Sequence, residues 1–235
     1  MPLLDLSDRR ELEWLAQLVA DVRAAAPGME PLLVGALARD LLLQHGHGFK
    51  IERATTDVDF ALAVASWEQF SAVRAALLAS DLFSPYRNTA HKLRHSKFGS
   101  IDLIPFGALE RSDGTIAWPP AGDEVMAVIG YAEAAASAMT LALPGHQTVR
   151  VVSLPMLAVL KLLAETPGIM ADLTTPGRVK RLWEACSLPD FRQHGADTHR
   201  AEPDFHVAAG IPRQRRNAVA HLHAVFQQRG RYLPR

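Results

Sequence analysis

The sequence predicts an α+β protein in which a mixed β-sheet flanked by helices is followed by a helical C-terminal region. Two observations favour this class. Short apolar runs bounded by glycine or proline alternate with stretches that repeat their apolar residues at helical spacing, as far as about residue 152. Beyond that point one clear helical stretch follows, and the periodicity then weakens. We therefore expect a sheet-containing domain over residues 1–152 and a helical region over residues 153–235.

The predicted helices each begin at a capping residue or a turn. Ser7 and Ser66 stand at the start of amphipathic stretches and can cap them. Gly35 turns a strand into the second helix, and Pro155 fits the first turn of the fourth. The helices are expected over 7–26, 36–44, 66–79 and 155–165, with two less regular ones over 179–186 and 216–227.

The predicted strands are short apolar runs. Two of them flank Pro144-Gly145, which predicts a hairpin. The segment 107–124 is punctuated by Asp113-Gly114 and Pro119-Pro120, so we expect a loop with room for a hairpin. The strands are expected over 31–34, 58–64, 92–95, 100–106, 139–143 and 148–152.

The composition is that of an ordinary globular protein. Lys and Arg together number 25, as do Asp and Glu, so the net charge is zero, which argues against a protein that coats nucleic acid. Because Cys186 is the only cysteine, no intramolecular disulfide can form, and a cytoplasmic location is expected. The N-terminus does not read as a signal peptide, and no apolar stretch approaches the roughly 20 residues of a membrane helix, so no membrane partner is expected.

The stretch RATTDVDFAL, residues 53–62, places two carboxylates in an apolar run. Residues two apart in a strand point to the same side, so Asp57 and Asp59 share one face while Val58 and Phe60 take the other. Two carboxylates this close repel each other unless they are exposed or partnered, and a divalent cation is the economical partner. Two acids on a solvated strand face are the alternative.

A third carboxylate, Asp102, lies in a second apolar run, SIDLI. An isolated acid in a buried strand also needs a partner. If this strand lies beside the first, Asp57, Asp59 and Asp102 converge, and three carboxylates can hold two metal ions for phosphoryl transfer. Oxygen ligands without nearby cysteine or histidine spacing favour Mg²⁺ or Mn²⁺ over zinc.

The run LLVGA, residues 32–36, predicts a strand, a glycine and the start of a helix. Gly35 permits a close approach of the backbone. The helix that begins at Ala36 offers free N–H groups and a positive dipole end to an anion such as a phosphate. A simple strand-to-helix turn is the alternative.

Taken in this order, the motifs resemble the nucleotidyltransferase superfamily. Within it, LLVGALARDLLL, RATTDVDFALAV, IDLIPFG, WPP and VVSLPMLAVLKLLA, all within residues 30–165, resemble the nucleotidyl transferase AbiEii/AbiGii toxin family. The resemblance implies a nucleotidyltransferase-like sheet that carries the catalytic and metal-binding acids Asp57, Asp59 and Asp102. It also implies a group of nucleotide-binding residues, namely Gly35, Ala36, Arg53, Thr55 and Lys161.

The resemblance implies Mg²⁺- or Mn²⁺-dependent transfer of an NMP group from an NTP to an acceptor. In the family the acceptor can be a tRNA 3′ end, and the protein is then the toxin of a toxin–antitoxin system; a protein acceptor is the other option. The implied partners are an NTP, a tRNA or protein acceptor and a cognate antitoxin. Nothing in the residues themselves reads out RNA.

Two departures from the family pattern motivate a second hypothesis. The first motif has Gly35-Ala36 where the family has a glycine pair, and the chain after about residue 165 lacks the family's closing helix. The alternative function is therefore a catalytically impaired nucleotidyltransferase fold that binds a nucleotide or a partner without turnover. A phosphohydrolase that uses the same acids is a third possibility.

The basic segment HKLRH, residues 91–95, precedes the strand of Asp102. Alternation puts Lys92 and Arg94 on one face, and a solvated edge is the favoured interpretation, with a phosphate contact as the alternative. Other polar or aromatic groups are expected to be structural, namely Arg39 with Asp40 as an ion pair, and Trp67 and Trp118 as packing residues.

Overall fold

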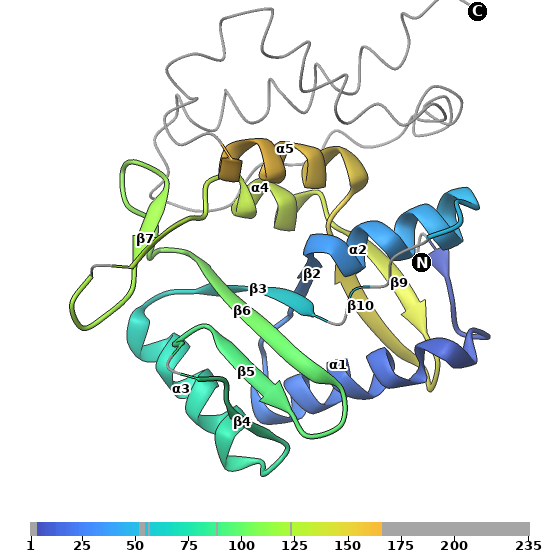
Figure 1. Cartoon of the computed structure of the whole chain (residues 1–235), viewed down its shortest axis with the longest axis horizontal. Helices are drawn as coiled ribbons and strands as arrows, with labels where there is room; N and C mark the ends of the chain where they lie inside the picture. Colours follow the sequence, from blue (N-terminus) through green and yellow to red (C-terminus); the bar gives the residue numbers. More distant parts are fainter. Residues whose placement is uncertain (1–3, 52–54, 56, 88, 123, 166–235) are drawn as a thin grey trace, which may run out of the picture.

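The computed structural model describes residues 4–51, 55, 57–87, 89–122 and 124–165; the helices predicted over 179–186 and 216–227 lie outside these ranges. A mixed sheet of eight strands forms the centre (Figure 1). Its strands are β1 (Leu4–Asp5), β2 (Leu32–Val34), β3 (Val58–Val64), β4 (Phe83–Pro85), β5 (Lys92–His95), β6 (Gly99–Gly107), β9 (Met139–Leu143) and β10 (Gln147–Val151). A separate two-stranded sheet consists of β7 (Thr115–Ala117) and β8 (Val125–Ala127).

The order of the strands places β3 near the middle of the sheet. The order is β1-β9-β10-β2-β3-β6-β5-β4. Strand β3 runs antiparallel to β2 on one side and parallel to β6 on the other, and β6 is antiparallel to β5. The sheet therefore mixes both pairings, as the predicted fold class requires.

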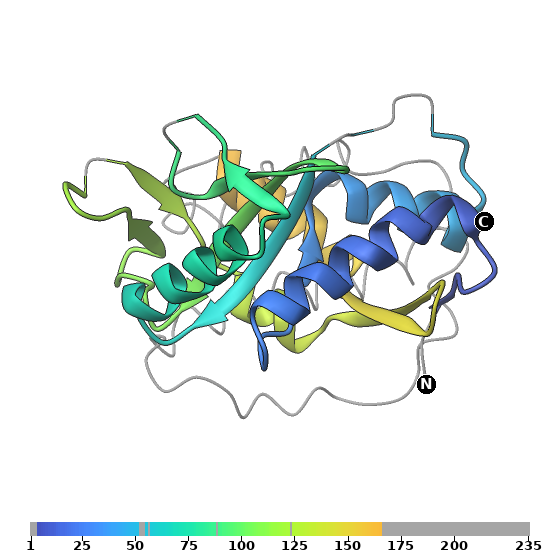
Figure 2. The same cartoon turned by 90° about the horizontal axis from the view of Figure 1, so that it is seen from below.

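Helices cover both faces of this sheet. One layer contains η1 (Arg10–Leu12), α1 (Glu13–Ala25) and α3 (Trp67–Ala79), and α1 and α3 lie in front of the sheet in Figure 2. The other contains α2 (Gly35–Leu41), its π-helical continuation η2 (Leu42–Gly46), α4 (Tyr131–Ala136) and α5 (Leu154–Glu165). None of the helices in the described ranges combines the length and the apolar character needed to cross a membrane.

The alternation of side chains along β3 decides which face meets the main core. Val58, Phe60 and Leu62 are fully buried, while Asp59 between them is half-buried on the opposite side. Burial of such large apolar side chains contributes about 1.5–3 kcal/mol each. The acids are thus fixed in place by the burial of their neighbours.

Most predicted elements are confirmed. Strands β3 and β5 and helix α3 have the expected bounds, and Ser66 caps α3 by accepting a hydrogen bond from the backbone N–H of Gln69. The predicted hairpin is formed by β9 and β10. Residues of α5, among them Met156 and Val159, belong to the same core as the sheet, and the domain division at residue 152 stays a prediction.

Three details differ from the prediction. Ser7 does not cap the first helix; the chain first makes the turn η1, Leu12 takes the N-cap position of α1, and the Ser7 N–H donates to the Asp5 side chain instead. The strands β1 and β4 have two and three residues, too few for a periodic signal. Helix α4 is a short turn of six residues that begins after Gly130 in the left-handed conformation.

Candidate active site

The three acids predicted from the sequence lie together on one face of the sheet. Asp59 of β3 stands directly opposite Asp102 of β6 in the parallel register. Asp57 precedes β3 by one residue and Asp59 by two. The strands β3 and β6 are therefore neighbours, which is the condition under which the sequence predicts that the three carboxylates converge.

Gly35 is in contact with this acid cluster. It follows Val34, which pairs with Asp59 across the β2–β3 ladder, and its φ of +70° is a conformation that side chains other than glycine rarely adopt. A Cβ atom at this position would overlap with Oδ2 of Asp59 and lie 2.7 Å from its Cγ. The glycine is thus required both by the backbone turn and by the space that the Asp59 carboxyl group occupies.

The electrostatics of the cluster show how closely the acids interact. Burial and the charges of Asp102 and Asp57 raise the pKa of Asp59 from 3.8 to about 6, and Lys92 opposes this rise. Asp102 is the first and Asp57 the second of the two acids whose charge adds to the effect of burial on Asp59. Within the described residues, the three acids therefore carry more negative charge than Lys92 neutralises.

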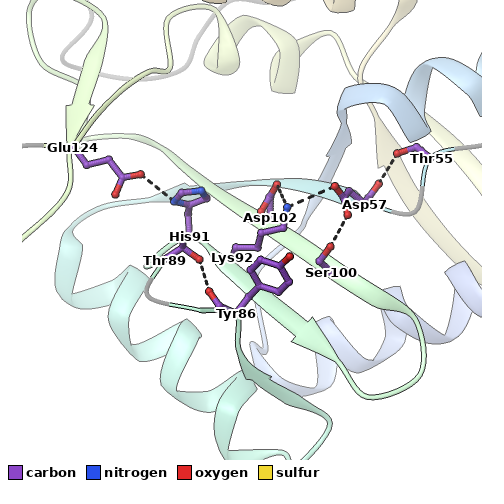
Figure 3. A network of polar contacts seen from close by, with 9 residues as sticks. All are labelled: Thr55, Asp57, Tyr86, Thr89, His91, Lys92, Ser100, Asp102 and Glu124. Carbon is purple, nitrogen blue, oxygen red and sulfur yellow. Dashed lines mark hydrogen bonds and ion pairs between the residues drawn. The ribbon is translucent and has the colours of Figure 1, made fainter.

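Lys92 is a cation that contacts the cluster from within the described part of the chain (Figure 3). Lys92 pairs with Asp102 across the β5–β6 ladder, and its Nζ lies 3.3 Å from Asp102 Oδ2 and 3.6 Å from Asp57 Oδ2. Burial alone would lower the pKa of Lys92, but the carboxylates of Asp102 and Asp57 outweigh it and the pKa is raised. The interpretation of this residue as part of a solvated edge is wrong, because its side chain is only 18% exposed.

Two hydroxyl groups hold Asp57 from either side (Figure 3). The Ser100 hydroxyl donates a short hydrogen bond to Asp57 Oδ1 from the strand next to β3. The Thr55 hydroxyl donates to the Asp57 backbone carbonyl at 3.5 Å. Ser100 thus orients the Asp57 carboxylate, whereas the Thr55 contact is long for a hydroxyl group. The Asp57 side chain is half-exposed and still faces solvent.

Tyr131, the first residue of α4, lies near enough to Asp59 for the charge of that carboxylate to act on its hydroxyl group. Its ring packs on Phe106 with centroids 6.0 Å apart. Burial and the charge of Asp59 raise the pKa of Tyr131 to about 12, so its hydroxyl group stays protonated at neutral pH. It therefore adds no charge to the cluster.

The chemistry of these residues fits a divalent cation. Within the described ranges, no group of three or more His, Cys, Asp or Glu side chains is arranged to hold a metal ion as it stands; the Lys92 ammonium lies between Asp57 and Asp102. However, Asp102 Oδ1 is buried without a hydrogen-bond partner among the described residues, and Asp59 is under repulsion from both other acids. An all-oxygen donor set with unsatisfied negative charge is what Mg²⁺ or Mn²⁺ requires.

The predicted nucleotide-binding residues are placed less directly. Ala36 lies in the first turn of α2, beside Gly35 and the acids. Lys161 is an exposed residue of α5, a helix that packs against α2 and α4. Arg53 lies outside the described residues. Their roles with a nucleotide remain predictions.

The residues expected to be structural behave so. Arg39 donates from two guanidinium nitrogens to Asp40 Oδ1, at 2.7 and 2.8 Å, which confirms the ion pair. Trp118 is buried against Trp67, with ring centroids 5.1 Å apart, so packing is confirmed for this pair. A cavity of about 600 Å³ beside these rings is lined by residues of α3 and of neighbouring loops, and the three acids do not line it.

Three site residues were not identified from the sequence as members of the cluster: Lys92, Ser100 and Tyr131. The register of β5 with β6 places the first two residues at the cluster. Lys92 stands opposite Asp102, and Ser100, two residues before Asp102 on β6, stands opposite Arg94. That register follows from strand order, which no single motif reveals. The position of Tyr131 depends on how the layer of α2, α4 and α5 folds, and no local sequence pattern predicts it.

No protein-family model and no curated protein matches the chain. The structure matches the solution structure of the antibiotic-resistance factor ANT(2'')-Ia, over 92% of this chain and 93% of that chain, with 12% identity and a TM-score of 0.37. A likeness of this size does not establish a common activity, so the geometry of the site bears on function by itself.

Proposed function

We propose that the protein transfers a nucleotidyl group from a nucleoside triphosphate to an acceptor, with Mg²⁺ or Mn²⁺ as cofactor. One observation carries the proposal: Asp59 and Asp102 stand in register on adjacent parallel strands, with Asp57 on the same side. Mutual repulsion makes such a cluster costly to the fold. Its presence at a glycine turn that leaves room for only the Asp59 carboxyl group indicates a binding function.

Asp57, Asp59 and Asp102 would hold the divalent cation. A cation bound there neutralises charge on the triphosphate and lowers the pKa of an attacking hydroxyl group. Asp102 Oδ1 is buried without a hydrogen-bond partner among the described residues, which supports a role for this oxygen in the reaction. Asp57 is oriented toward the site by Ser100, and its exposed half leaves it open to a ligand.

The chain's own residues then carry the transfer. The oxygen of the acceptor hydroxyl group forms a bond to the α-phosphorus, the bond from that phosphorus to the β-phosphate oxygen breaks, and pyrophosphate leaves. The hydroxyl proton passes to Asp102. Gly35 and Ala36 place backbone N–H groups at the phosphates, and Arg53 and Lys161 contact the triphosphate or the nucleotide. Positioning and charge neutralisation supply most of the acceleration.

The acceptor class follows from the family resemblance of the sequence. By that resemblance the acceptor is a tRNA 3′ end or a protein, and the protein acts as the toxin of a pair with an antitoxin. A test of the acceptor therefore begins with total bacterial RNA and with the protein itself.

A second function, binding without turnover, is favoured by a specific observation. The Lys92 ammonium lies between two of the acids, where it reduces the charge available to a metal ion. A protein of this kind would hold a nucleotide or a partner and release neither pyrophosphate nor NMP.

The enzyme and the alternatives are separated by an α-labelled NTP. The full chain is incubated with each labelled NTP, Mg²⁺ and total bacterial RNA, beside Asp57→Ala and Asp59→Asn. Asp8→Asn is the control, since Asp8 is an exposed acid far from the cluster in sequence. Transfer should fall at least about 100-fold in both site variants and not in the control.

The remaining outcomes are distinct. Calorimetric binding of an NTP with no label on RNA or protein would establish the binding module. Release of labelled NMP without an acceptor would establish a phosphohydrolase. Equal transfer by the wild type and Asp59→Asn would refute the assignment of the site.

A further inference from the structure

We propose that Lys92 is a built-in counter-ion of the acid cluster, which competes with the divalent cation for Asp57 and Asp102. Binding of the cation to these carboxylates then requires the ammonium group to leave them. The inference rests on the proposed function only in that it takes a divalent cation to bind at these acids. It assigns Lys92 a role in setting the affinity of the cation.

The backbone register fixes where Lys92 can reach. Lys92 stands opposite Asp102 on the neighbouring antiparallel strand, so the two side chains form a cross-strand pair. Asp57 belongs to the chain leading into β3, on the far side of β6 from Lys92. The lysine side chain therefore reaches across β6 and places one nitrogen between a carboxylate of β6 and a carboxylate of the segment that precedes β3 (Figure 3).

The position of the nitrogen is the basis of the competition. Nζ contacts Oδ2 of Asp57 and Oδ2 of Asp102, and the side chain is 18% exposed. A cation bound to these same oxygen atoms would occupy the space that Nζ occupies. A divalent cation and an ammonium group that contact the same carboxylates would also repel each other, in a site partly removed from water. The ammonium and a divalent cation are therefore alternatives at these oxygens.

The ammonium group also has a partner that is not a carboxylate. Nζ is 5.4 Å from the centroid of the Tyr86 ring, which is within the range of a cation–π contact. The flexible four-carbon stem allows Nζ to keep this contact after it leaves the carboxylates. The ring is also contacted by Arg87, at 5.4 Å, so it already serves as an acceptor for positive charge.

The consequence is a cation affinity below that of the bare carboxylates. The ammonium stabilises the three acids when no metal is bound, and this stabilisation is lost when the metal enters. Removing the charge of Lys92 should therefore have two opposite effects. It should weaken the fold without metal and strengthen the binding of the metal.

The test is a titration of the full chain with Mn²⁺, followed by the EPR signal of the free ion. Lys92→Met keeps the length of the side chain and removes its charge. Arg94→Met is the matched control, because Arg94 lies two residues further along β5 on the same face and is exposed. We expect the Kd for Mn²⁺ to fall about tenfold or more in Lys92→Met and to change less than about threefold in Arg94→Met.

Melting curves provide the second readout. In EDTA, Lys92→Met should melt at a lower temperature than the wild type, and Mn²⁺ should raise its melting temperature by more. If Lys92→Met does not fold, Lys92→Gln is titrated in its place. An unchanged or larger Kd without the lysine charge, or no Mn²⁺ binding to any of these proteins, would overturn the proposal. If the wild type transferred no label, but the Kd for Mn²⁺ fell as expected on replacing Lys92 by Met, only the proposed function would be overturned.

Discussion

Replacing Asp59 by Asn should stabilise the protein in the absence of metal. Burial and the other two acids raise the pKa of Asp59 from 3.8 to about 6. At about 1.4 kcal/mol for each pKa unit, the ionised carboxylate destabilises the fold by about 3 kcal/mol. The Asn side chain has nearly the same shape and carries no charge. We therefore expect Asp59→Asn to be about 1–3 kcal/mol more stable at pH 8, the upper figure being reached if the amide finds a hydrogen-bond acceptor in the site.

The sign of the pH dependence provides a stringent check. The Asp59 carboxyl group is ionised above a pH of about 6 in the folded protein and above 3.8 in the unfolded chain. Its destabilising effect is therefore complete at pH 8, shrinks as the pH falls through about 6, and is absent below 3.8. The advantage of the Asn variant should follow the same course.

Urea unfolding at pH 8, 6 and 4.5 in EDTA measures these differences, with Asp8→Asn as the control. A metal ion at the site should reverse the order at pH 8, because only the wild type gains stability from it. If Asp59→Asn were less stable than the wild type at pH 8, or if its advantage did not depend on pH, the raised pKa of Asp59 would be refuted.

Three further changes test other parts of the site. Gly35→Ala should lower the free energy of unfolding by more than about 2 kcal/mol and abolish Mn²⁺ binding. Gly28→Ala is the control: Gly28 has φ +82° with open space around it, so this change carries only the backbone strain of about 1–2 kcal/mol. Equal losses of free energy in urea unfolding would contradict the contact of Gly35 with Asp59. Ser66→Ala should lower the free energy of unfolding by about 1 kcal/mol through loss of the α3 cap. An unchanged urea midpoint would show that the cap does not contribute to stability. Ser100→Ala should weaken Mn²⁺ binding severalfold in the EPR titration by freeing the Asp57 carboxylate; tighter binding would mean that the hydroxyl group competes with the cation.

The two-residue spacing of the acids made much of the site predictable. Asp57 and Asp59 lie on one side because a strand alternates, and their neighbour Phe60 is completely buried on the other. Asp102 could be linked to them because it also interrupts an apolar run. Gly35 could be recognised as a strand-to-helix turn, but its contact with the Asp59 side chain required the pairing of β2 with β3.

The role of Lys92 could not be predicted in this way. Alternation placed Lys92 and Arg94 on the same face, which is correct, but it does not distinguish the lysine opposite Asp102 from the arginine opposite Ser100. The difference arises from the order of the strands, which depends on contacts between residues far apart in the sequence. Ser7 failed as a cap for a related reason: the turn η1 lies between it and α1 and satisfies the backbone differently.

We expect Asp57, Asp59 and Asp102 to bind one shared divalent cation. Crystals of the full chain soaked with Mn²⁺ and a non-hydrolysable NTP analogue test it most directly, through the anomalous signal of manganese. The account predicts an anomalous peak at bonding distance, about 2.0–2.2 Å, from oxygens of the three acids, with the Lys92 ammonium displaced from them. An anomalous signal elsewhere, or carboxylates that still hold only Lys92 at saturating Mn²⁺ and nucleotide, would contradict it.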